Sequence, residues 1–73
     1  MGIEVRRTLK GPGWDLKIEI FRREDDSFGF QEMGYGFDDN KWYPTGRYLT
    51  GYFASEQEAL REVRNRVSWL QEF

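Results

Sequence analysis

Hydrophobic and polar residues alternate along the first third of the chain, a pattern that predicts β-strands. Residues 3–10 show an imperfect period of two, and residues 14–21 show a clean one. In the second run, one face carries Trp14, Leu16, Ile18 and Ile20, and the other carries Asp15, Lys17, Glu19 and Phe21. Gly11-Pro12-Gly13 between the runs is a strong turn signal. We therefore expect two antiparallel strands, the second of them half-buried.

Aromatic residues from position 28 to 37 predict a third strand, after a turn at residues 24–27. The rings change phase along it, because Phe28 and Phe30 share one face and Met33, Tyr35 and Phe37 share the other. We expect a β-bulge near Gln31 or Glu32 to reconcile the two sets. Residues 38–46 are expected to form a loop that contains Trp42, and residues 47–53 a last strand.

The sequence after the last strand predicts a helix. Ser55-Glu56-Gln57-Glu58 is a capping box, in which Ser55 accepts from the Glu58 backbone N–H and the Glu58 side chain reaches back to the Ser55 N–H. Beyond it, apolar residues recur at helical spacing, namely Ala59, Leu60, Val63, Val67 and Leu70. Glu62 and Arg66 are spaced for a favourable i,i+4 pair.

Four strands followed by one helix indicate an α+β fold of two layers, with an antiparallel sheet and the C-terminal helix packed on one sheet face (ββββα). Residues 1–73 are expected to form a single domain, because this length is near the lower limit for an unassisted core. Aromatic residues make up 18% of the chain and supply large buried areas. No apolar run approaches the roughly 20 residues that span a bilayer, and no apolar signal core is present, so we expect a cytoplasmic protein without membrane contact.

The composition disfavours catalysis. The chain has no cysteine and no histidine, which removes the usual zinc ligands and most nucleophile–base pairs. The acidic runs at residues 24–26 and 38–39 are explained by turn chemistry. Residues 38–43 do not fit an EF-hand, because Trp42 and Tyr43 stand where a ligand and a glycine are needed. We expect no enzymatic activity, no cofactor and no metal.

The chain contains more aromatic residues than a core between one helix and one sheet face needs. Tyrosine, tryptophan and arginine concentrate at the energetic centres of protein interfaces. We therefore expect the sheet face away from the helix to bind another protein, or a second copy in a homodimer, as a small adaptor or inhibitor does. The residues expected to contact the partner are Arg6, Lys17, Phe21, Arg23, Tyr35, Trp42, Tyr43, Arg47, Tyr48 and Tyr52. The alternative is that these rings cover the edges of a small core.

A second function class, single-stranded nucleic-acid binding, follows from the charge distribution. Residues 1–23 carry six lysines and arginines against three acids, whereas residues 24–58 carry eight acids against two bases. Residues 33–37, Met-Gly-Tyr-Gly-Phe, partly resemble the glycine-aromatic strand of RNA-recognition and cold-shock domains, which implies base stacking on the sheet. Arg6, Lys17, Tyr35 and Arg47 are the residues expected to carry it. The net charge of −2 favours the protein-binding hypothesis.

Overall fold

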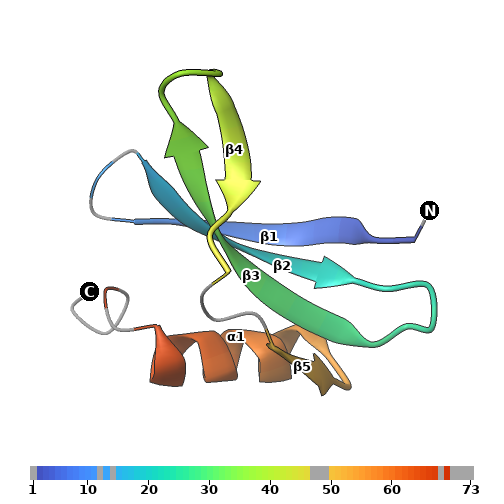
Figure 1. Ribbon diagram of the computed structural model, residues 1–73. Coiled ribbons are helices and arrows are strands. Elements are labelled where there is room, and N and C mark those ends of the chain that lie inside the picture. Colours follow the sequence, from blue (N-terminus) through green and yellow to red (C-terminus); the bar gives the residue numbers. More distant parts are fainter. Residues whose placement is uncertain (1, 12, 14, 47–49, 68, 70–73) are drawn as a thin grey trace.

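The chain folds into one antiparallel sheet with a helix along one face (Figure 1). The computed structural model describes residues 2–11, 13, 15–46, 50–67 and 69. Its elements are β1 (Glu4–Lys10), β2 (Leu16–Arg22), β3 (Phe28–Gly36), β4 (Lys41–Pro44), β5 (Thr50–Phe53) and α1 (Glu56–Arg66). This arrangement confirms the predicted α+β class. None of the described helical residues belongs to a segment long and apolar enough to cross a membrane.

The strands run in the order β1-β2-β3-β4, and β5 also pairs with β3. One edge of the long strand β3 is therefore divided between β5 and β4. Its first residues pair with β5, Phe28 opposite Phe53, and its last residues pair with β4, Tyr35 opposite Trp42. In Figure 1 the β3–β4 hairpin rises away from the helix, whereas β5 lies close to it.

Strand β4 corrects the sequence prediction, which placed residues 38–46 in a loop. Only the first part of that segment turns, and Asn40 closes the turn with a left-handed backbone (φ 56°) that asparagine tolerates. Its N–H donates to the Gly36 carbonyl at 2.8 Å. The chain then returns along β3 as a hairpin. The predicted last strand is present over Thr50–Phe53, and residues 47–49 lie outside the described residues.

The predicted bulge at Gln31 or Glu32 is wrong, because β2 and β3 pair without interruption from Leu16–Gly34 to Arg22–Phe28. The alternation along β3 is kept, and the helix-facing position after Phe30 is filled by the buried Glu32 instead of another ring. The bulges lie in the neighbouring strands. One is at Arg6 in β1, and the other is in β5, where Gly51 has φ 84°.

The core lies between α1 and the sheet face that we call the inner face. Six residues there are fully buried: Ile18, Ile20, Phe30, Ala59, Val63 and Val67. The first two are the predicted apolar row of β2, and the last three belong to the predicted stripe that runs along the helix and onto its C-cap. Trp14 and Leu70, predicted to join them, lie outside the described residues.

The start of α1 follows the capping box with one difference. The Ser55 hydroxyl accepts from the Glu58 N–H at 3.1 Å, as predicted. The Glu58 carboxylate accepts from the Ala54 N–H at 3.3 Å, one residue earlier than the donor predicted for it. The predicted ion pair between Glu62 and Arg66 is present.

Candidate functional site

The sheet face opposite α1, which we call the outer face, is the candidate site. Strand register places on it the residues that alternate with the core row, because successive side chains of a strand point to opposite faces. Its residues are Val5, Thr8, Lys10, Lys17, Glu19, Phe21, Gln31, Met33, Tyr35 and Trp42. No described element packs over this face.

One aromatic cluster on the outer face is centred on Trp42. Its ring meets Tyr35 edge-on, with centroids 5.3 Å apart, and Tyr35 meets Phe37 edge-on at 6.0 Å. Lys17 reaches across from β2 and places its Nζ 4.3 Å from the Trp42 ring centroid. The same Nζ lies 3.3 Å from a carboxylate oxygen of Glu19. The cluster thus combines a cation–π contact with an ion pair on half-buried side chains.

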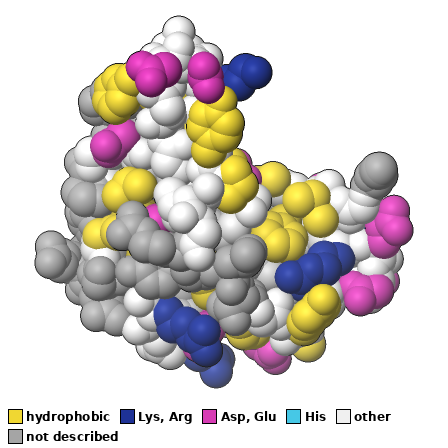
Figure 2. Space-filling view, viewed as in Figure 1, with side chains coloured by type: hydrophobic (Ala, Val, Ile, Leu, Met, Phe, Trp, Pro, Cys, Tyr) yellow, Lys and Arg dark blue, Asp and Glu magenta, His cyan; other side chains and the backbone are white. Residues whose placement is uncertain are grey.

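This cluster lies along the projecting β3–β4 hairpin. In the space-filling view, hydrophobic side chains flank that hairpin, and acidic side chains gather at its tip (Figure 2). The exposed tip residues include Phe37, Asp38, Asp39 and Lys41.

A second cluster, at the opposite end of β2, is built around Arg23. Its guanidinium lies 5.1 Å from the Phe21 ring centroid and 4.2 Å from that of Tyr52. It also donates to the Phe28 and Gly51 carbonyls, at 3.3 and 3.2 Å. A Cβ atom at Gly29 would lie 2.6 Å from Arg23, so glycine leaves the space that this cluster occupies.

Two depressions accompany the clusters. A groove of about 240 Å³ beside Trp42 is lined by Thr8, Lys10, Gly13, Leu16, Lys17 and Trp42. A shallower one of about 370 Å³ beside Arg23 is lined by Gly2, Ile3, Arg23, Glu24 and Asp25. The first is smaller than the clefts that usually enclose small-molecule ligands, and the second is wide and shallow.

The structure brings five of the predicted site residues to these clusters: Lys17, Phe21, Arg23, Tyr35 and Trp42. Tyr52 joins them at the β5 edge, where 75% of its surface is exposed. Phe21, in contrast, is buried beneath its neighbours. Arg47 and Tyr48 lie outside the described residues.

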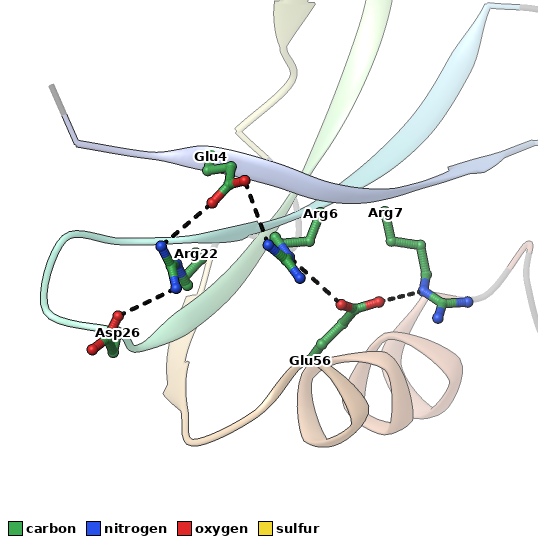
Figure 3. A network of polar contacts seen from close by, with 6 residues as sticks. All are labelled: Glu4, Arg6, Arg7, Arg22, Asp26 and Glu56. Carbon is green, nitrogen blue, oxygen red and sulfur yellow. Dashed lines mark hydrogen bonds and ion pairs between the residues drawn. The ribbon is translucent and has the colours of Figure 1, made fainter.

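Arg6 lies elsewhere. The bulge in β1 turns it toward the helix side, where its Nε is 3.9 Å from Glu56 at the start of α1 (Figure 3). Arg7 donates to the same carboxylate at 2.8 Å. The network continues through Glu4 and Arg22 to Asp26, so it ties β1, the β2–β3 turn and α1 together.

Tyr43 also lies away from the outer face, because it pairs with Gly34 on the inner row of β3. Its hydroxyl donates to the Asp39 carboxylate. That carboxylate beside the phenol raises the pKa of Tyr43 above its usual range.

The acidic turn at residues 24–27 shows the turn chemistry expected of it. The Asp25 carboxylate accepts from the Ser27 hydroxyl at 2.6 Å and from the Ser27 backbone N–H at 3.0 Å. These hydrogen bonds lower the pKa of Asp25. Within the described ranges no group of three or more acidic side chains is arranged to hold a metal ion.

Sequence reasoning named none of the outer-face residues of β1, namely Val5, Thr8 and Lys10. The register of β1 against β2 would have found them, since Thr8 lies opposite Glu19 and Lys10 opposite Lys17. That register is shifted by the bulge at Arg6, which the sequence pattern does not reveal.

Comparisons with known proteins give no relative whose function could guide the interpretation of this geometry. No protein-family model matches the chain, and neither a curated protein nor a solved structure matches it.

Proposed function

We propose that this protein is a non-catalytic protein-binding domain whose outer face is the interface. The observation that supports the proposal most directly is the pairing of cations with aromatic rings there: Lys17 on Trp42, and Arg23 on Phe21 and Tyr52. Aromatic rings and arginine dominate the binding energy of protein interfaces. Of these residues only Phe21 is buried, and none of them belongs to the core cluster between α1 and the inner face.

The two clusters sit at opposite ends of the same face, with Glu19, Gln31 and Met33 between them. An interface of this kind has aromatic anchors surrounded by polar and apolar contacts, as specific interfaces do. A partner that spans the face would contact both anchors. A small adaptor, an inhibitor or a second copy of the chain has the size to do so.

Site-specific photocrosslinking tests the proposal. A benzophenone amino acid replaces Thr8 or Tyr52, which are exposed on or beside the outer face, and in matched controls replaces Gln57 or Arg61, exposed on α1. We expect discrete protein adducts from the first pair alone, identified by mass spectrometry in the cells that produce the protein. Equal adducts from both pairs, or none from the outer face, would contradict the proposal.

Single-stranded nucleic acid is the second candidate, because two lysines flank the Trp42 groove. The geometry supports it less. Lys17 is already paired with Glu19, and Arg6 faces Glu56 on the other side of the sheet. Binding of a labelled oligonucleotide that weakens steeply as salt is added would favour this candidate.

A further inference from the structure

The Trp42 groove contains two lysines directly opposite each other. Lys10 in β1 and Lys17 in β2 are cross-strand partners on the outer face, and both line the groove. Like charges in this position repel each other. Lys17 is stabilised by Glu19 and the Trp42 ring, whereas Lys10 has no ion pair within the described part of the chain. The two lysines together therefore carry one positive charge that no described acidic side chain balances.

The other residues that line the groove indicate what kind of negatively charged ligand would fit there. Thr8 adds a hydroxyl, Trp42 adds apolar surface, and no described lining residue is acidic. A ligand with a hydrogen-bond acceptor beside an apolar group fits this combination. A volume of about 240 Å³ is below the range of whole-cofactor sites and holds one or two side chains.

We infer that the groove binds an aspartate or glutamate side chain of the partner, presented next to an apolar side chain. The carboxylate lies between Lys10 and Lys17, and the apolar neighbour packs on the Trp42 ring. This inference rests on the proposed function and names the chemistry of the partner segment.

The surroundings of the groove favour one carboxylate over a chain of phosphates. Glu19 lies beside Lys17, and Asp15 lies beside Gly13 at the rim. Asp38 and Asp39 are exposed at the tip of the neighbouring hairpin. A nucleic-acid strand would bring further negative charges close to these acids, and that repulsion opposes the contacts with the lysines.

Blocked tetrapeptides provide the test. The probes are acetyl-Gly-Glu-Leu-Gly-amide and its glutamine counterpart, followed by amide chemical shifts of Lys10 and Lys17 and by the Trp42 indole signal. We expect the glutamate peptide to bind about two- to fivefold more tightly than the glutamine peptide, the range that one exposed ion pair provides. Lys10→Gln should remove that ratio. Lys41→Gln, a matched change of an exposed lysine outside the groove, should leave it intact.

Three results would overturn the inference. The first is equal binding of the two peptides, or no binding of either at millimolar concentration. The second is tighter binding of acetyl-Gly-Gln-Leu with a free C-terminus, which would mean a terminal carboxylate is the ligand. The third is a larger effect of octathymidylate on the same signals. Photocrosslinking from Thr8 and Tyr52 tests the proposed function separately from the groove. Protein adducts at these positions support the interface even if the peptides do not bind.

Discussion

The carboxylate of Glu32 accepts a hydrogen bond from the indole N–H of Trp69 at 2.9 Å, across 37 residues of chain. Its other oxygen accepts from the Thr45 hydroxyl at 2.7 Å, and its backbone carbonyl accepts from the Thr45 N–H at 3.0 Å. Only 1% of Glu32 is exposed. One buried side chain of β3 therefore fastens the segment after β4 and the segment after α1 to the sheet.

Glu32→Ala should destabilise the fold by about 2–4 kcal/mol, because it removes the buried carboxylate that accepts from both Trp69 and Thr45 and leaves a cavity in its place. Glu32→Gln should cost less, since the amide oxygen still accepts one of the two bonds. Urea unfolding followed by tryptophan fluorescence measures both. Glu62→Ala is the control, since it removes an exposed helix pair worth only about 0.3–0.5 kcal/mol. Equal midpoints for Glu32→Ala and the control would contradict the assignment.

Arg22 and Arg23 are adjacent in sequence, but we expect Arg23 to contribute much more to the stability of the fold than Arg22. Arg23 stacks on two rings and donates to two carbonyls, a geometry that the planar guanidinium allows and an ammonium does not. Arg22 makes two exposed ion pairs at 3.5 Å. Arg23→Lys should therefore cost about 1–2 kcal/mol in denaturant unfolding, and Arg22→Lys less than about 0.5 kcal/mol. Similar losses from both would mean that charge alone matters at position 23.

Local signals in the sequence predicted the parts of the fold that depend on local patterning. The alternation from Leu16 to Phe21 identified the buried face of β2, and the capping residue Ser55 marked the start of α1. Both are short-range effects that a few neighbouring residues determine. The class of fold followed from counting such elements.

Features set by strand pairing were beyond that reasoning. β4 has only four residues, and it exists because it pairs with the far half of β3. Arg6 was expected at the aromatic site because the sequence pattern does not reveal the bulge in β1. The bulge turns Arg6 to the other side of the sheet, where it lies beside Glu56. The excess of aromatic residues indicated the outer face, but only the register reveals the opposed lysines there.

The contact between Tyr43 and Asp39 predicts a pH effect. Its raised pKa means that the folded state holds the phenolic proton more tightly than the unfolded chain does. The stabilisation from this contact is therefore complete at neutral pH and is lost as pH rises through the folded pKa. Asp39→Asn should lower the Tyr43 pKa toward the usual value of about 10. An NMR titration of the Tyr43 ring measures it, with Asp38→Asn as the control that should leave the pKa unchanged. Equal shifts in the two variants would argue against a specific hydrogen bond.

Gly46 and Gly51 share a left-handed backbone, with φ 85° and 84°, but differ in what surrounds them. A Cβ atom at Gly46 meets nothing within 4 Å, whereas one at Gly51 would lie 2.6 Å from the Phe53 ring. That ring stacks on the buried Phe30, with centroids 5.9 Å apart, so moving it disturbs the core. Gly46→Ala should cost about 1 kcal/mol from backbone strain alone.

Gly51→Ala should cost about 2–4 kcal/mol, because strain adds to the displacement of Phe53. Thermal unfolding of the two variants compares them directly. If both lose the same stability, the β5 bulge accommodates a methyl group, and the contact between β5 and the core is looser than the stacked rings indicate. The larger loss at Gly51 would show that the bulge sets the position of Phe53, and with it the carbonyl that binds Arg23 on the outer face.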